Sequence, residues 1–305
     1  MMTKTPPIHE HTIGRDGLVV LRLTDGDAQL AGVDGDRVTV RSADDDGLDG
    51  FTIERGERSL EISAQGADSA GLDIDVPTGA TVILEARSAD VTVANLTGDV
   101  RLTTASGDLR VRDVSGTLTA EAVSGDLEVV ASGTLSIEAR TVSGDLELRA
   151  RTLEHLKATT TSGDLTIVGQ FVGAGPFVIE TVSGDTSLAP VGDVRIEAAT
   201  LTGDIHGRGI GHRSSRDHGP IVIGSGGGPI VAFRSTSGDL SIVPRAPGDA
   251  EPPRTTDEAD ATEAPADDDT TLSILRALER DEIDLEEASH RLAALDARES
   301  DRDDA

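Results

Sequence analysis

The chain has 305 residues, carries a formal net charge of −29 and contains no cysteine. The charge excludes a typical nucleic-acid-binding protein, which needs a positive surface for phosphates, and opposes docking on anionic lipid. The lack of cysteine excludes disulfides and thiolate metal sites. Aromatic residues make up 1% of the chain, so we expect a thin core of small aliphatic side chains.

The acidity has a characteristic composition, since Lys4 and Lys157 are the only two lysines. Abundant Asp with few Lys is similar to proteins of salt-in halophilic archaea, where acidic side chains hold hydration water at high salt; an acidic protein of a high-GC actinobacterium is the alternative. No apolar run approaches the roughly 18 residues of a membrane span, and the N-terminus has no apolar export signal. We therefore expect a cytoplasmic protein, membrane-adjacent only through a partner.

The first elements introduce a repeat. We expect residues 1–10 to be disordered and residues 11–244 to form one domain. Gly26-Asp27 and Gly35-Asp36 lie nine residues apart and resemble successive turns, and the stretch from Phe51 to Gly66 has the pattern of a hairpin. The segment that follows leads directly into a regular array.

The array repeats the words Ser-Gly-Asp or Thr-Gly-Asp. From the second glycine onward the spacing is 18, 19, 19, 21 and 19 residues, then 35, which indicates coils of about 19 residues. We interpret these glycines as structural turn residues, since glycine tolerates positive φ. They are Gly98, Gly107, Gly125, Gly144, Gly163, Gly184, Gly203 and Gly238.

Short strands follow each turn. Counting the glycine as zero, positions +2 and +4 are mostly apolar and position +3 is mostly polar, as in Leu127, Glu128 and Val129. Small residues recur at −5, Thr at −3 and further apolar residues at −2. A fixed period with like residues in register predicts an all-β β-solenoid whose coils stack about 4.8 Å apart.

The C-terminal third changes character. The period breaks in a loop over residues 206–220, and the array resumes with what we expect to be the last coil, ending at Pro244. Residues 245–269 have the composition of a disordered acidic linker, residues 270–297 predict an α-helical hairpin, and residues 298–305 form a disordered acidic tail. The apolar positions of the hairpin, which we expect to dock on a protein partner or a second copy, are Leu272, Leu275, Leu278, Ile283, Leu285, Ala288, Leu292 and Leu295.

The repeated aspartate has two interpretations. Clustered carboxylates suit calcium, but the nonapeptide pattern of calcium-binding β-rolls does not occur. We favour turn chemistry, in which the Ser and Asp side chains bond local backbone N–H groups. The residues of the alternative calcium ladder are Asp108, Asp126, Asp145, Asp164, Asp185 and Asp204.

Other candidate chemistry is weaker. The stretch Gly224–Pro229 lacks the Lys-Ser/Thr ending of a phosphate loop, and the spacing of His206, His212 and His218 favours a loop over a zinc site. No nucleophile elbow occurs. We therefore expect no enzyme and no cofactor.

At this point the array resembles a known family. The words TVSGDLEL from Thr141 and STSGDLSI from Ser235 are similar to those of the bacterial and archaeal family of unknown function called putative adhesin, over roughly residues 15–244. The stretch ILRALERDEIDLEEASHRLAAL resembles the short SHOCT-like hairpin that accompanies it. The resemblance implies a β-solenoid without catalytic residues and a link to cell-envelope stress.

Three hypotheses for function follow. The first is a non-catalytic adhesin-like scaffold whose C-terminal hairpin binds a partner or another copy. The second is a solenoid that polymerises end to end, as bactofilin-type cytoskeletal proteins do, through exposed strand edges. The third is a calcium-binding β-roll.

Overall fold

The computed structural model describes residues 9–43, 48, 50–64, 71–207, 213–214, 221–223, 225 and 227–245. These residues belong to a compact unit, Met1–Arg254, that is separate from Thr255–Ala305. The expected hairpin over residues 270–297 and the tail lie outside the described residues, as does the linker except for Arg245.

All helices and strands assigned in the described residues are β-strands, so the prediction of an all-β solenoid is confirmed. No helix in this part of the chain is long and apolar enough to cross a membrane. The strands are β1 (His9–Thr12), β2 (Leu18–Val33), β3 (Arg37–Ser42), β4 (Phe51–Arg55), β5 (Ser59–Ala64), β6 (Leu72–Pro77), β7 (Thr81–Ala94), β8 (Val100–Ser106), β9 (Leu109–Arg112), β10 (Gly116–Ser124), β11 (Leu127–Ser143), β12 (Leu146–Ser162), β13 (Leu165–Phe171), β14 (Phe177–Ser183), β15 (Thr186–Pro190), β16 (Val194–Thr202), β17 (Asp204–Gly207), β18 (Arg213–Ser214), β19 (Ile221–Ile223), β20 (Ile230–Ser237) and β21 (Leu240–Ile242).

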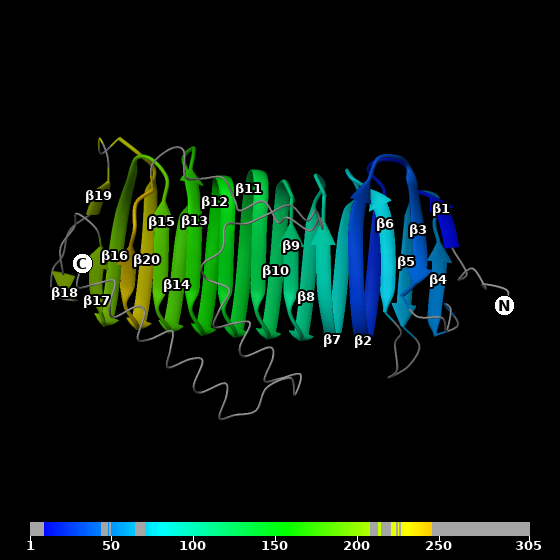
Figure 1. Cartoon of the computed structure of the whole chain (residues 1–305), viewed down its shortest axis with the longest axis horizontal. Coiled ribbons are helices and arrows are strands. Elements are labelled where there is room, and N and C mark those ends of the chain that lie inside the picture. Colours follow the sequence, from blue (N-terminus) through cyan, green and yellow to red (C-terminus); the bar gives the residue numbers. More distant parts are fainter. Residues whose placement is uncertain are drawn as a thin grey trace, which may run out of the picture. The chain divides into compact units, whose positions relative to one another are not determined.

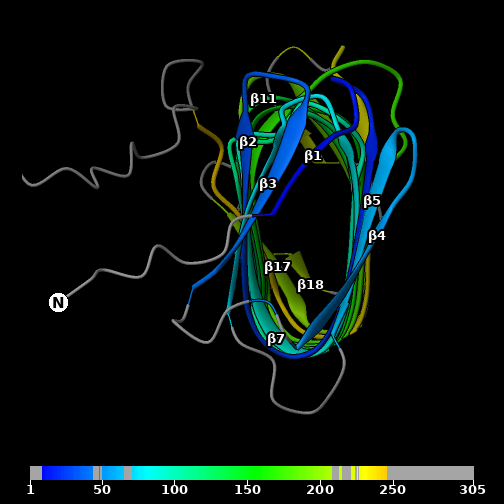
Figure 2. The same cartoon turned by 90° about the vertical axis from the view of Figure 1, so that its right-hand side faces the viewer.

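Two sheets face each other across the interior of the solenoid (Figure 2). Each coil adds one strand to the first sheet and one to the second, and longer strands such as β7 bend at a corner and contribute to both. The first sheet runs in the order β4, β5, β2, β7, β8, β10, β11, β12, β14, β20, β16, β19. The second runs in the order β1, β3, β6, β2, β7, β9, β11, β12, β13, β15, β21, β17, β18.

The order of coils departs from the sequence at both ends. The coil of β20 and β21 comes last in sequence, yet it lies between the coil of β14 and β15 and that of β16 and β17 (Figure 1). The stretch from Ile221 to Val243, expected to contain the last coil, therefore supplies the last coil but one of the stack through β20 and β21. At the other end, β2 lies between β7 and the later pair β5 and β6.

Antiparallel strands close each end of the stack. β4 pairs antiparallel with β5, β3 pairs antiparallel with β6, and β1 pairs antiparallel with β3. At the other end, β18 and β19 pair antiparallel with β17 and β16. The hairpin expected from Phe51 onward is thus confirmed as β4 and β5.

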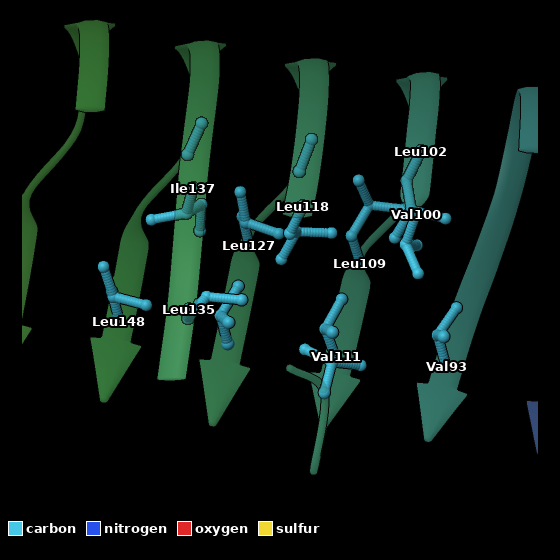
Figure 3. Packing of buried hydrophobic residues seen from close by; sticks show 14 of the residues in the cluster. Val93, Val100, Leu102, Leu109, Val111, Leu118, Leu127, Leu135, Ile137 and Leu148 are labelled. Atoms are coloured by element: carbon cyan, nitrogen blue, oxygen red, sulfur yellow. The ribbon is translucent and has the colours of Figure 1, made fainter. Parts of the chain in front are cut away.

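The core consists of the aliphatic side chains that the period-two pattern places inside. Positions +2 and +4 are buried in successive coils, as in Leu127 and Val129 or Leu146 and Leu148. Figure 3 shows core residues of the two sheets, such as Leu118 and Leu127, side by side in the interior. The narrow interior explains the shortage of aromatics, and the largest fully buried side chains are Phe177 and Phe233.

Ion pairs on the outer face of the first sheet connect neighbouring coils. The Arg22 guanidinium pairs with Glu61 on one side and Glu85 on the other, and the Lys157 ammonium lies 2.7 Å from the Glu138 carboxylate. Exposed pairs add little stability each. However, opposite charges directly across a pair of strands favour the correct register over a shifted one.

Candidate functional site

The repeated Ser/Thr-Gly-Asp words form one corner of the solenoid, at which the chain passes from the first sheet to the second. Gly107, Gly125, Gly144, Gly163, Gly184, Gly203 and Gly238 all have positive φ, between 108° and 152°. Gly98 differs, because it lies at the opposite corner, one half-coil before Gly107, and is not among the positive-φ residues. Gly98 therefore belongs to a different corner and does not share the positive φ of the other seven.

Stacking of the coils gives a second reason for glycine at this corner. A Cβ atom built on Gly144 would lie 2.7 Å from the carbonyl carbon of Gly125 in the preceding coil and closer still to its oxygen. Gly163 meets Gly144 in the same way, and Gly184 meets Gly163. Each repeat glycine therefore leaves room for the backbone of its neighbour.

The aspartates of this corner form a continuous hydrogen-bonded ladder. The backbone N–H of Asp145 donates to Oδ1 of Asp126 at 2.9 Å, and that of Asp164 donates to Oδ1 of Asp145 at 2.8 Å. We expected such bonds to be local, but they join successive coils. In spatial order the ladder contains Asp90, Asp108, Asp126, Asp145, Asp164, Asp185, Asp239 and Asp204.

Backbone bonds complete each corner. The Gly125 N–H donates to the Ser143 carbonyl at 3.2 Å, and the Leu127 N–H donates to the Asp145 carbonyl at 2.9 Å. The Asp N–H points toward the previous coil, where the carboxylate supplies the acceptor. Because backbone donors need partners wherever water is restricted, one aspartate per coil allows the sharp corner to stack without losing a bond.

This geometry explains the aspartates without a metal. Oδ1 of seven of the eight ladder carboxylates accepts a backbone hydrogen bond, and no group of three or more acidic or histidine residues in the described part of the chain is arranged to hold a metal ion. Asp90 and Asp239 belong to the same ladder, although neither was among the candidate calcium residues. Asp90 was missed because Ala89 stands where the repeat has glycine. Asp239 was missed because its coil follows the previous repeat after 35 residues instead of about 19.

A column of hydroxyls lies just inside the corner, at position −3. Thr141, Thr160 and Thr181 are buried, and their hydroxyl oxygens have no hydrogen-bond partner among the described residues. Thr104, in the same column, donates to the Ser106 carbonyl at 2.8 Å. Sequence reasoning predicted this Thr column from the repeat alone.

The corner also turns an apolar column outward. Position −3 is buried or, at Thr200 and Ser235, half-buried, but positions −2 and −1 are both exposed, so the period-two alternation is interrupted there. Val123, Val142 and Val182 are 54%, 45% and 50% exposed, and Leu201 is 72% exposed. The sequence showed that position −2 is apolar, but not that it faces solvent.

The remaining candidates are not brought together. His206 is exposed on β17, whereas His212 and His218 lie outside the described residues. In the glycine-rich stretch, Gly228 packs against the backbone of Asp193. The Asp193 carboxylate accepts a hydrogen bond from the Ser225 hydroxyl, and this bond lowers the pKa of that carboxyl. The hairpin leucines belong to the part of the chain that is not described.

Two charged contacts perturb titration elsewhere. The hydrogen bond from Lys157 lowers the pKa of Glu138. At the N-terminal end, partial burial, then the charge of Arg55 and then His11 lower the pKa of His9, whose ring nitrogen accepts a hydrogen bond from Arg55 Nε at 3.0 Å. Both contacts join separate strands.

Comparison with known protein families places most of this stack of coils in one family. The family model described as Toastrack DUF4097 matches residues 50–243. The chain belongs to the Toastrack family. Among curated proteins none matches this Toastrack chain.

Solved structures similar to this Toastrack protein have diverged far in sequence. A putative adhesin from Bacteroides fragilis is 12% identical and matches 80% of this chain and 98% of its own, with a TM-score of 0.43. A putative adhesin from Parabacteroides distasonis is also 12% identical, over 77% of this chain and 96% of its own, with a TM-score of 0.37. A putative lipid binding protein from the same species is 8% identical, over 80% and 98%, with a TM-score of 0.27.

Proposed function

We propose that this Toastrack protein is a non-catalytic, adhesin-like scaffold that presents fixed rows of side chains to a protein partner. The observation that carries the proposal is the aspartate ladder, in which seven hydrogen bonds of 2.8–3.0 Å link eight successive coils at one corner. A ladder of this kind holds the outward side chains of each coil at a constant spacing. Fixed rows suit recognition of an extended partner, because little conformational entropy is lost on binding.

The C-terminal segment supplies the second part of the proposal. The pattern of residues 270–297 predicts a helical hairpin similar to SHOCT, which is too small to be stable without a partner. We propose that it docks on a protein partner or on another copy, in a cytoplasmic setting linked to envelope stress and near the membrane only through that partner. Cell fractionation tests the compartment.

Deletion of residues 270–297 tests the scaffold. Sedimentation velocity and affinity purification of the full chain and the deleted chain should differ in oligomeric state or in the proteins recovered. Deletion of residues 298–305 is the matched control and should change neither. If the 270–297 deletion also leaves both readouts unchanged, the part of the scaffold proposal that assigns partner docking to the hairpin is wrong.

End-to-end polymerisation is less well supported. Each end of the solenoid carries antiparallel strands, such as β4 and β19, in place of a parallel strand that another coil could extend directly. At one end β18 and β19 are only two and three residues long, and very short edge strands limit pairing with another chain. Filaments in negative-stain images at working salt would reverse this preference.

A further inference from the structure

A line of exposed side chains along the Ser-Gly-Asp corner, four of them aliphatic and two of them threonine, lies outside the core. We call it the corner ridge, and it consists of position −2 in six neighbouring coils. The residues before and after this position pair in register from coil to coil, so the ridge is straight. In spatial order it contains Val123, Val142, Thr161, Val182, Thr236 and Leu201.

The exposure of the ridge is unusual for its composition. Its three valines are about half exposed and Leu201 is 72% exposed. Single exposed aliphatics are common on protein surfaces, but four of them in one row, interrupted only by Thr161 and Thr236, form an apolar line of the kind that often marks an interaction site. The same position could accept Ser or Thr without disturbing the core, since Thr161 and Thr236 already occupy it.

The surroundings of the ridge define the charge of its partner. Three residues further along each coil stands the aspartate ladder, in which Asp126, Asp145, Asp164 and Asp185 are exposed. The ladder uses Oδ1 of each carboxylate as an acceptor. A partner on the ridge therefore meets a row of negative charges beside an apolar line.

The same charges argue against a second copy as the occupant. Two ridges packed against each other would bring two aspartate ladders together, in a chain whose net charge is −29. Like charges at such an interface oppose association. A basic partner, in contrast, gains both the apolar contact and the charge complementarity.

We propose that the corner ridge is the docking line for a basic amphipathic helix of a partner protein. Five steps of about 4.8 Å give a ridge about 24 Å long, which is the length of about 16 helical residues. One face of a helix presents a side chain about every 5.4 Å, near the coil spacing, whereas one face of a strand presents one about every 6.8 Å. This inference rests on the proposed scaffold function, because it names the chemistry of the scaffold's partner.

The test measures binding of a defined probe to the full chain. The probe is a fluorescein-labelled 18-residue peptide of leucine and lysine, with leucines at i, i+3, i+4 and i+7, followed by fluorescence anisotropy. The variant Val123→Ser/Val142→Ser/Val182→Ser should bind at least tenfold more weakly, since each valine loses apolar contact area. The control variant Val33→Ser/Val172→Ser/Val222→Ser changes valines that are also exposed but lie off the ridge, and should bind as the natural protein does.

Further arms separate specific docking from general attraction to an acidic protein. A peptide of the same composition with leucines spread around the helix should bind at least tenfold more weakly than the amphipathic one. Replacing Asp126, Asp145, Asp164 and Asp185 by Asn keeps a side-chain acceptor and should flatten the salt dependence of binding.

Three results would overturn the inference: equal binding by both valine variants, no binding by the natural protein, or binding of the ridge to phosphatidylcholine vesicles in place of the peptide. These outcomes leave the scaffold test untouched, because that test depends on residues 270–297. Failure of the deletion experiment alone would remove the hairpin as the contact and leave the ridge in place.

Discussion

Replacement of one repeat glycine by alanine tests whether stacking, and not only backbone conformation, requires glycine at the corner. Gly144 and Gly35 form a matched pair, with φ of 144° and 147°. A Cβ on Gly35 meets no atom within 4 Å, whereas a Cβ on Gly144 lies 2.7 Å from the Gly125 carbonyl carbon. The two alanine variants therefore share the conformational strain and differ in the clash.

The structure gives the magnitude of that difference. Positive φ costs a residue with a side chain about 1–2 kcal/mol. Relief of the clash with the Gly125 carbonyl carbon, from 2.7 Å to the 3.4 Å at which ordinary contact begins, requires the coils to separate by about 0.7 Å, and the closer contact with the carbonyl oxygen requires more. That shift stretches the adjacent corner bonds, Gly125 N–H to the Ser143 carbonyl at 3.2 Å and Asp145 N–H to Asp126 Oδ1 at 2.9 Å, and each lost bond costs about 1 kcal/mol.

Gly144→Ala should therefore destabilise the solenoid by about 3–4 kcal/mol and Gly35→Ala by about 1–2 kcal/mol. Urea unfolding followed by far-UV circular dichroism measures both, and hydrogen exchange at the corners of neighbouring coils locates the damage. Equal destabilisation by the two variants would refute the stacking argument, because only the shared strain would then matter.

Three further predictions concern charge. Asp145→Asn should destabilise the solenoid less than Asp145→Ala in urea unfolding, since Asn keeps the acceptor for the Asp164 N–H; equal effects would mean that the ladder bond is unimportant. The lowered pKa of Glu138 means that its contact with Lys157 stabilises the fold above the unfolded pKa near 4.5 and is lost as pH falls through the lower folded value, so Lys157→Met should lower the urea midpoint at pH 7 but leave it unchanged at pH 2. Thermal melts in low salt should respond to KCl and to calcium only according to ionic strength, and rescue by millimolar calcium alone would make the ladder aspartates ligands.

Much of the solenoid could be predicted from the sequence because every coil must bury the same positions and make the same turn. Positions such as Leu127 and Val129 alternate with polar residues, and the period of the glycines gives the length of a coil. The order of the end coils could not be predicted this way. The words around Gly203 and Gly238 are nearly the same. Judged by sequence pattern alone, either coil could therefore stack directly on the coil of β14 and β15.

The corner was harder to predict than the strands. The pattern favoured turn chemistry for the aspartates, but the direction of the Asp145 N–H toward another coil depends on the stacking geometry. The exposure of Val142 depends on the two outward positions that precede Gly144. A strict period-two rule does not include such an interruption.

The displaced coil has a consequence for synthesis of the chain. During translation, β16 is made before β20, yet β20 separates it from β14 in the finished structure. The edge of β14 therefore stays open until residues 230–237 have left the ribosome, while β16 offers a nearly equivalent surface in the meantime. Correct assembly at this end requires that β16 either stays unpaired with β14 or is displaced from it until β20 is available. A chain cut before residue 230 would therefore end in a different order of strands from the natural one.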